Sequence, residues 1–449
     1  MEMTRRSLLT AGAAASAAVA AASSLTLAAA PQQAQAKAPE RSSEDWLGTA
    51  PEIAEPDIVE TRECELLIVG AGNAGMAAAA AAAELGMDFI VAEKGSVVGA
   101  TRHWLGAVNS KYCEAAGVCD DKGKLLNELV RYASGKCDPR VWKVWIDESA
   151  SMIDWLDELL VGAGMTCALD VDNQDPTGGT CYYIPYTEHY YSGKDAEGNR
   201  LVRNEIFERY INSLGYNVSY ETSLVKLEQD EAGRVTGGIF QTVDGYVRIN
   251  ASAGVLLATG GYPANPAMCR SLAPIIDRVV TLVYYNTNDT GDGIKAAMWV
   301  GGQMDPLACA CTFNRAAVKP VEKAGDGVVG EWWWFGEQPF MKVNLNGKRF
   351  CNESGPYDYM LHSTIMQPGH TYCDIFDSDY AAQVKQMNEV GCCRLFPFDN
   401  GAKNNIPFDV VWNNMNAKLI EDGYIQQADT IEELAEKLNI PAENLVATV

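Results

Sequence analysis

The chain has 449 residues and is 47% hydrophobic, so it can hold one large cofactor domain and a second domain. Its 59 acidic residues outnumber its 35 basic residues and give a formal net charge of −24. Nucleic acids and anionic membrane surfaces repel such a chain, so the charge argues against both as partners. Thirteen cysteines are scattered along the chain, with neither zinc-ligand spacing nor a Cys-x-x-Cys-His haem motif. Mostly buried thiols are therefore expected, and an iron–sulfur cluster assembled from distant cysteines is the unsupported alternative.

The N-terminal segment has the features of an export signal. Arg5-Arg6 precedes a long alanine-rich apolar run, and Ala34-Gln35-Ala36 is a small-x-small cleavage pattern. We expect residues 1–36 to be a twin-arginine signal peptide, which would place the protein in the periplasm or at the cell surface. An uncleaved membrane anchor is the alternative, because the apolar run is long enough to span a bilayer. Residues 37–62, rich in Pro, Glu, Ser and Ala, are expected to form a linker or an ordered N-terminal arm.

A dinucleotide-binding pattern begins at residue 64. The apolar run Leu66–Val69 is typical of a strand that is buried on both faces of a parallel sheet. Three glycines with Gly-x-Gly-x-x-Gly spacing follow it. Gly70 permits a tight turn, Gly72 lets the backbone approach a pyrophosphate, and Gly75 lets the following alanine-rich helix lie close to the strand.

A second predicted strand, Phe89–Ala92, ends at Glu93 and Lys94. Glu93 lies about 20 residues after the glycine turn, where a carboxylate can accept hydrogen bonds from the adenosine ribose. The strand, the turn, the helix, the second strand and the terminal acid all agree. The sequence therefore predicts a dinucleotide site rather than an ordinary glycine turn.

The later elements follow from hydrophobic periodicity. Helical patterns cover 122–132, 139–160 and 201–214, and a long polar loop is predicted over 170–200. The apolar residues of the second helix recur at helical spacing, which indicates core packing rather than a binding surface. A β-meander then leads into a buried strand at 254–258.

Two further glycine turns lead to a family. The turn Ala258-Thr259-Gly260-Gly261 and the turn Thr290-Gly291-Asp292-Gly293 resemble those of the soluble fumarate reductase and succinate dehydrogenase flavoprotein family. The resemblance implies an α/β fold in which a Rossmann-type FAD-binding domain with a β-meander, residues 63–305, is followed by an α+β capping (clamp) domain, residues 306–449. It also implies FAD as the cofactor. The residues expected to contact FAD are Gly70, Gly72, Asn73, Ala74, Gly75, Glu93, Lys94, Gly99, Ala100, Thr101, Val225, Ala258, Thr259, Gly260 and Asp292.

The clamp-domain signature Gly-x-Arg-Phe-x-Asn-Glu is matched from Gly347 to Glu353. By spacing from this signature, Tyr357 replaces the arginine that donates a proton in the family. Glu331 matches the glutamate of the family's proton relay. A packing tyrosine and a solvated loop acid are the alternatives for these two positions. His362 and His370 are expected to be structural.

The same resemblance shows where the chain departs from the family. The substrate-binding His-Pro-Thr is Asp305-Pro306-Leu307 here, and the carboxylate-gripping Thr-Glu is Gly330-Glu331. An arginine of the proton relay is replaced within Trp332-Trp333-Trp334. Groups that bind a small dicarboxylate are thus lost and aromatic surface is gained. Because neighbouring strand residues point to opposite sides, we expect at least one of these tryptophans to face a pocket or an interface.

These features predict an FAD-dependent reductase that acts on the C=C bond of an α,β-unsaturated substrate bulkier than fumarate. A separate electron-donor protein, such as a membrane-bound or c-type cytochrome, is implied. A flavin-dependent dehydrogenase of the 3-ketosteroid type is the enzymatic alternative. The sequence ends at NLVATV, where the family continues into a segment that closes the flavin site. The chain is therefore expected to be a fragment of a longer enzyme, and a truncated, non-catalytic FAD-binding protein is the alternative.

Overall fold

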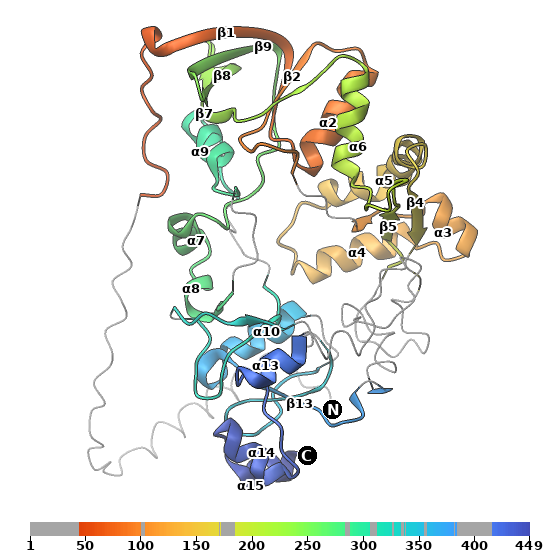
Figure 1. The fold of residues 1–449 in the computed structure, drawn as a ribbon, viewed down its shortest axis with the longest axis vertical. Helices are drawn as coiled ribbons and strands as arrows, with labels where there is room; N and C mark the ends of the chain where they lie inside the picture. Colours follow the sequence, from red (N-terminus) through yellow and green to blue (C-terminus); the bar gives the residue numbers. More distant parts are fainter. Residues whose placement is uncertain are drawn as a thin grey trace, which may run out of the picture. The chain divides into compact units, whose positions relative to one another are not determined.

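The structure is a computed structural model, shown in Figure 1. It describes residues 45–99, 104–169, 171, 185–282, 288–305, 312–325, 327–333, 336, 338–353, 357–380, 382–383 and 415–449. The expected signal peptide, residues 1–36, and the first part of the expected linker lie outside this set and stay predictions. Within the described set, no helix combines the length and the apolar character needed to cross a membrane.

A six-stranded sheet with the strand order β6-β2-β1-β9-β8-β7 is the frame of the FAD-binding domain. Strands β6, β2, β1 and β9 run parallel, and β9, β8 and β7 form the predicted antiparallel meander. The expected α/β fold is therefore confirmed. The strands are β1 (Ile58–Val69), β2 (Phe89–Ala92), β6 (Val218–Ser219), β7 (Ser223–Gln229), β8 (Val235–Thr242) and β9 (Gly245–Leu257).

The structure differs from the predicted strands in two places. Strand β9 joins the last strand of the meander and the predicted buried strand at 254–258 into one element, because it pairs with β8 on one side and with β1 on the other. Strand β1 begins at Ile58, inside the expected linker 37–62, since Ile58 already pairs with Tyr246. A preceding 3-10 turn, Glu55–Asp57, is tied to the sheet by an ion pair of 2.6 Å between Glu55 and Arg248.

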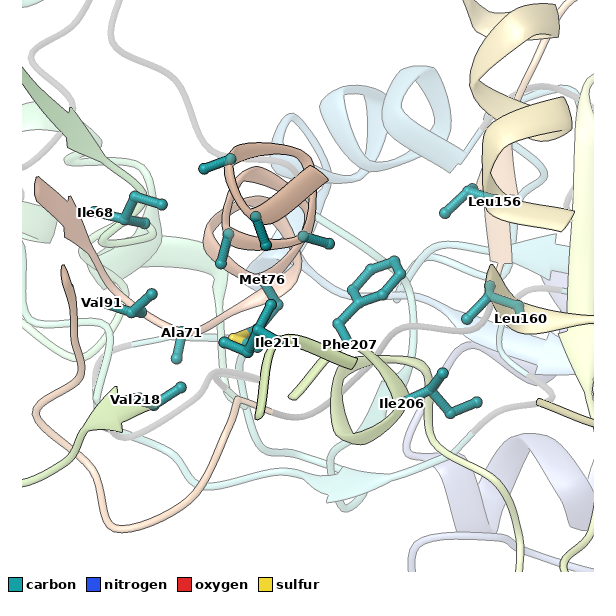
Figure 2. Packing of buried hydrophobic residues seen from close by; sticks show 14 of the residues in the cluster. Ile68, Ala71, Met76, Val91, Leu156, Leu160, Ile206, Phe207, Ile211 and Val218 are labelled. Carbon is teal, nitrogen blue, oxygen red and sulfur yellow. The ribbon is translucent and has the colours of Figure 1, made fainter. Parts of the chain in front are cut away.

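The core on one face of the sheet, shown in Figure 2, combines residues of the sheet with residues of α2 (Asn73–Glu84), α6 (Arg203–Ser213) and α5 (Pro139–Leu160). Ile68 belongs to this core, whereas its neighbours Leu67 and Val69 belong to the core on the opposite face. This alternation confirms that the first strand is buried on both sides. Each fully buried Leu or Ile side chain contributes about 1.5–3 kcal/mol of stability.

A separate three-stranded sheet has the order β3-β5-β4. The prediction of a loop over 170–200 is wrong at β5 (Glu188–Ser192), which pairs with β3 (Trp104–Gly106) and β4 (Thr166–Leu169). His189, Tyr190 and Tyr191 are buried by strands that are distant in the sequence. The polar composition of this stretch therefore did not predict a strand. The remaining helices of the domain are α3 (Lys111–Ala116), α4 (Lys122–Tyr132), α7 (Pro266–Leu272), α8 (Ile276–Val279) and α9 (Asp292–Trp299).

The chain after residue 305 mixes short strands and helices, as expected for an α+β clamp domain. Val343 of β12 packs with Ala435, Ile440 and Leu445 in a small core. These elements are β10 (Ala316–Ala317), β11 (Glu331–Trp332), β12 (Met341–Val343), β13 (Cys373–Ile375), α10 (Tyr357–Ile365), a 3-10 turn (Pro368–His370), α13 (Ala417–Glu421), α14 (Ile431–Leu438) and α15 (Ala442–Thr448).

A lysine–aspartate pair is completely buried in the small sheet of β12 and β13. Lys342 Nζ lies 2.5 Å from Asp374 Oδ1, and neither side chain is exposed. Lys342 also donates hydrogen bonds to the backbone oxygens of Gln338 (2.8 Å) and Gly336 (3.2 Å). Burial raises the pKa of Asp374 to about 7, although the attraction of Lys342 acts in the opposite direction.

The titration of Asp374 predicts a pH dependence of stability. The folded protein holds this proton up to about pH 7, whereas a free aspartate releases it near 3.8. The contribution of the group to the free energy of unfolding is therefore complete below about pH 4 and is lost as the pH rises towards 7. We expect the wild type to lose stability relative to Asp374→Asn across this window. Urea unfolding at several pH values measures the difference, and a constant difference would contradict the prediction.

Candidate functional site

The predicted glycine turn is formed where β1 meets α2, and it packs against the end of β9. Gly70 has a φ of +100°, which favours glycine. Its backbone N–H donates to Ala92 O at 2.8 Å, and a Cβ at this position would lie 2.5 Å from Ala258 O. The first turn and the later Ala-Thr-Gly-Gly turn therefore lie in contact, as the expected FAD site requires.

The other two glycines of the motif face different surroundings. A Cβ on Gly75 would lie 1.8 Å from Gly70 O, so only glycine lets α2 lie this close to the strand. A Cβ on Gly72 would meet no atom of the protein within 4 Å. Gly72 is also the N-cap of α2, where no side chain caps the first-turn amides. An open space beside uncapped helix amides fits a phosphate group.

The two later glycine turns also pack on each other. A Cβ on Gly293 would lie 2.0 Å from Thr259 Oγ1, and the Gly291 N–H donates to Gly261 O at 3.1 Å. Gly260 has a φ of +71°, and a Cβ there would lie 2.7 Å from a carboxylate oxygen of a neighbouring aspartate. These glycines bring the end of β9 and the start of α9 together without intervening side chains.

Lys94 connects the end of β2 to the start of α9. Its Nζ lies 2.7 Å from Asp292 Oδ2 and 2.8 Å from Thr290 Oγ1. Both charged side chains are partly exposed, so the pair contributes little to stability, about 0–1 kcal/mol. The position of the pair is more informative. It brings together Lys94 and Asp292, two residues from distant motifs that were both predicted to contact FAD.

Glu93 binds the backbone of the glycine turn. Its Oε2 accepts a hydrogen bond from the Ala71 N–H and its Oε1 accepts one from the Gly95 N–H, both at 2.7 Å. A carboxylate has about four lone-pair sites, so these two bonds leave capacity for the ribose hydroxyls expected from the sequence. The structure thus adds an organising role for Glu93 to the predicted ribose contact.

Val225 lies in strand β7, and Thr222, just before this strand, donates a backbone hydrogen bond of 2.9 Å to Glu93 O at the end of β2. The register of β7 with β8 passes from Leu224 opposite Phe240 to Lys226 opposite Ile239, so Val225 is the extra residue of a β-bulge. A bulge frees the backbone of the extra residue from the ladder. This geometry suits the predicted contact between Val225 and an adenine ring.

Asn204 is a residue of this site that the sequence pattern missed. It lies in the first turn of α6 and is completely buried. Its Nδ2 donates to Asn73 Oδ1 at 3.0 Å and to Gly99 O at 2.8 Å, and both of these residues were predicted to contact FAD. No sequence signal marked Asn204, because an asparagine at a helix start is ordinary capping chemistry. Ala100 and Thr101 lie outside the described residues.

The catalytic candidates lie in the part of the chain predicted to be the clamp domain, residues 306–449. Tyr357 is the first residue of α10, and its side chain is outside the described part of the chain. Glu331 is exposed in β11, where it pairs with Ala317. His370 is hydrogen-bonded through Nδ1 to Ile365 O at 2.8 Å, which agrees with the structural role expected for it.

Trp332 and Trp333, the two described residues of the tryptophan run, contact different side chains. Trp333 stacks on Phe376 with ring centroids 6.3 Å apart. Trp332 is half-buried, and the guanidinium of Arg315 lies 6.0 Å from its ring and 4.9 Å from the ring of Phe313. Trp334 and the segment 306–311 lie outside the described residues. Trp332 and Trp333 are both half-buried, and the expectation that one of the tryptophans faces a pocket or an interface stays a prediction.

A second polar cluster looks catalytic but is closed to substrates. Ser110 Oγ lies 2.6 Å from His189 Nε2, and both side chains are fully buried. Ser110 caps α3 by accepting hydrogen bonds from the N–H groups of Tyr112 and Cys113, while His189 Nδ1 lies 2.8 Å from Thr187 O. Because every polar atom is used and no surface is exposed, this pair is a structural connection between α3 and β5.

Among the described residues, no group of three or more His, Cys, Asp or Glu side chains could hold a metal ion. Burial raises the pKa of Cys64 and of Cys351 to about 11. Of the eight cysteines in the described part of the chain, only Cys64, Cys113 and Cys269 are fully buried, so the expectation of mostly buried thiols is not met there. The close pairs at 309/311 and 392/393 lie outside the described residues.

Comparison with known proteins yields one family model, described as FAD binding domain, which matches residues 65–449. Vinyl phenol reductase of Lactiplantibacillus plantarum is 24% identical over 390 residues, which cover 86% of this chain and 75% of that protein. The cytochrome fumarate reductase of Shewanella frigidimarina is 24% identical over 337 residues, which cover 72% of this chain. The chain spans about half the length of that fumarate reductase, 54%.

A solved structure of similar fold is 3-ketosteroid delta1-dehydrogenase from Sterolibacterium denitrificans, in complex with 1,4-androstadiene-3,17-dione. It superposes with a TM-score of 0.60 at 15% sequence identity and covers 86% of this chain and 78% of that one. At this level of identity the likeness concerns the fold alone.

Proposed function

Because this chain belongs to the flavoprotein family defined by the FAD binding domain, we propose that it reduces the C=C bond of an α,β-unsaturated substrate bulkier than fumarate. The family membership, with oxidoreductases among the relatives, confirms the expected family, FAD as the cofactor and the oxidoreductase class. The contacts among the three glycine turns, at 70–75, 258–261 and 290–293, together with the open space at Gly72, carry the cofactor part of the proposal.

We assign the cofactor's two ends to different parts of this site. The uncapped amides of α2 beside Gly72 would bind the pyrophosphate, Glu93 the ribose and the bulge at Val225 the adenine. The turns at Thr259 and Asp292 would hold the ribityl and flavin end. When bound, FAD supplies the hydride that the reduction requires.

The substrate preference rests on the residues that replace the dicarboxylate-binding groups. Asp305 stands where a family histidine would bind a carboxylate, and Gly330 stands where a threonine would do so. Trp332, flanked by Arg315, supplies an aromatic surface against which a flat ring can stack. The loss of groups that bind carboxylates and the gain of an aromatic side chain favour a substrate with an aromatic ring conjugated to the double bond.

Tyr357 is proposed as the group that protonates the substrate carbon. As the first residue of α10 it lies at the positive end of a helix, which stabilises the negative charge left after a phenol donates its proton. Glu331 is proposed to return a proton to this position from solvent, because it is exposed. A proton donor positioned in this way contributes about 10²–10⁴-fold to the rate.

Reoxidation of the reduced enzyme by candidate substrates tests the function. In stopped-flow experiments, aryl-substituted enoates, enones and vinyl phenols should reoxidise the reduced flavin of the purified chain faster than fumarate does. Oxidised flavin bleached by a saturated ketone, with no reoxidation by any alkene, would support the dehydrogenase alternative. A purified chain without flavin would instead support the truncated, non-catalytic alternative.

Tyr357→Phe is expected to lower kcat by about 10²–10⁴-fold with little change in KM, because the ring stays and the donor hydroxyl is lost. Steady-state kinetics on the best alkene measure the effect. Tyr359→Phe is the matched control. Tyr359 lies in the same helix, and its hydroxyl donates only a long bond, 3.4 Å, to Tyr132 O. Equal losses in both variants would contradict the assigned role.

We further propose that residues 1–36 direct export and that a separate electron-donor protein, such as a membrane-bound or c-type cytochrome, reduces the flavin. Replacing Arg5-Arg6 with Lys-Lys should leave the protein in the cytoplasmic fraction of the producing cell. Unchanged export of this variant would contradict the twin-arginine assignment. Reduction of the chain by membranes, followed through the flavin absorbance, tests the donor.

A further inference from the structure

We propose that Asn204 is a positioning residue for FAD, which holds the loop 95–99 and the start of α2 in their binding arrangement before the cofactor arrives. The inference rests on FAD binding at the glycine turn. It assigns a role to a residue outside all of the motifs that define that turn.

The first step is the position of the side chain. Asn204 has no exposed surface, although it is a polar residue in the first turn of α6. The acceptors Asn73 Oδ1 and Gly99 O are distant in the sequence from Asn204 and from each other, since Asn73 begins α2 and Gly99 ends the loop after β2. One amide nitrogen has two N–H groups, so a single side chain serves both acceptors at 3.0 and 2.8 Å.

The second step is the close approach of the loop to the turn. The Gly99 N–H donates to Ala71 O at 2.9 Å, and a Cβ on Gly99 would lie 3.0 Å from Gly72 Cα. The loop therefore has almost no room to move towards the turn, and the bond from Asn204 to Gly99 O opposes movement away from it. Asn204 thereby helps to hold Gly99 of the loop against Gly72 of the turn.

The third step is energetic. Without Asn204 the Gly99 carbonyl and the Asn73 side chain would lose their buried donor, and the loop would have to be ordered when the cofactor binds. Ordering during binding weakens affinity, whereas a site that is preformed avoids this cost. Asn204 is thus expected to act on FAD affinity without touching the cofactor.

The affinity of the flavin-free 449-residue chain for FAD, measured by quenching of FAD fluorescence, tests the proposal. Asn204→Leu removes both bonds at similar volume, and we expect the FAD Kd to rise about tenfold or more. Asn204→Asp keeps the shape of the side chain but places acceptor oxygens opposite Gly99 O and Asn73 Oδ1, so the FAD Kd should rise further than in Asn204→Leu. In a protein that already carries Asn73→Ala, Asn204→Leu should raise the FAD Kd by a smaller factor, because one of the two hydrogen bonds of Asn204 is already absent.

Asn314→Leu is the matched control, since this buried asparagine also donates to a backbone oxygen, Gly336 O, in the clamp domain. It should lower stability and leave the FAD Kd within about twofold. Equal weakening of FAD by Asn204→Leu and Asn314→Leu, or an unchanged Kd in Asn204→Leu, would overturn the proposal. A wild-type chain that binds no FAD would instead overturn the proposed function.

Hydrogen exchange of the wild-type protein supplies a test that needs no variant. If Asn204 preforms the site, the Gly99 amide should already be protected from exchange in the FAD-free protein. An amide that exchanges freely without FAD and becomes protected only with FAD would show that the cofactor orders the loop, which also overturns the proposal.

Discussion

Gly72→Ala is expected to leave the protein folded while FAD is lost. The backbone of Gly72 has φ −79° and ψ −164°, which alanine adopts without strain, and the added Cβ would meet no protein atom within 4 Å. The same Cβ would occupy the space where the pyrophosphate approaches the amides of α2. Loss of two charge-assisted hydrogen bonds of about 1.5–3 kcal/mol each predicts an affinity at least about 100-fold weaker.

Flavin absorbance of the purified variant and its FAD Kd measure the effect. Gly75→Ala is the informative contrast, because its Cβ would lie 1.8 Å from Gly70 O and must disturb the turn itself. We expect this variant to lose thermal stability as well as FAD. A Gly72→Ala protein that is purified yellow, with normal affinity, would show that the pyrophosphate does not lie beside Gly72.

Lys342→Met is expected to destabilise the clamp domain strongly. Above about pH 7, where Asp374 is ionised, the change leaves its carboxylate buried without its cation, and breaking one partner of such a pair costs about 3–5 kcal/mol. The double variant Lys342→Met, Asp374→Leu should recover most of this loss, because an apolar pair of similar volume needs no desolvation. Urea unfolding, followed by tryptophan fluorescence, measures the free energy of unfolding of both variants. Trp333 is a suitable reporter, because its backbone oxygen accepts a hydrogen bond from Gly336, whose own carbonyl accepts a hydrogen bond from Lys342.

An exposed ion pair gives the control for this prediction. Lys143 and Asp147 form an i,i+4 pair on α5, and the lysine side chain is 64% exposed. Lys143→Met should change the free energy of unfolding by less than about 0.5 kcal/mol. If Lys342→Met were equally mild, the buried pair would not be ionised in the folded protein.

The glycine turns could be predicted because their signal is local. Gly70, Gly72 and Gly75 are separated by fixed steps, and each step corresponds to a backbone requirement of a strand–turn–helix unit. The helices 122–132 and 139–160 were found for a similar reason, since the spacing of apolar residues records which face is buried.

Strand β5 and the length of β9 could not be predicted in this way. Each depends on partner strands far along the chain, and the polar residues of β5 are buried only because β3 and β4 flank them. Asp374 and Lys342 were also missed, because nothing in the sequence shows that two charged residues separated by a long interval share a dry core.

The sequence by itself predicted the glycine turns, because their geometry and the helix–strand periodicity around them depend on neighbouring residues, and the resemblance of these turns to a known family predicted the family and FAD. Only the tertiary structure decided which side chains organise those turns. Glu93 binds the backbone of its own turn, and Asn204 reaches Gly99 across 105 positions of sequence. The Asn204 contact depends on the packing of α6 on α2. Packing brings together residues whose spacing along the chain does not predict that they meet.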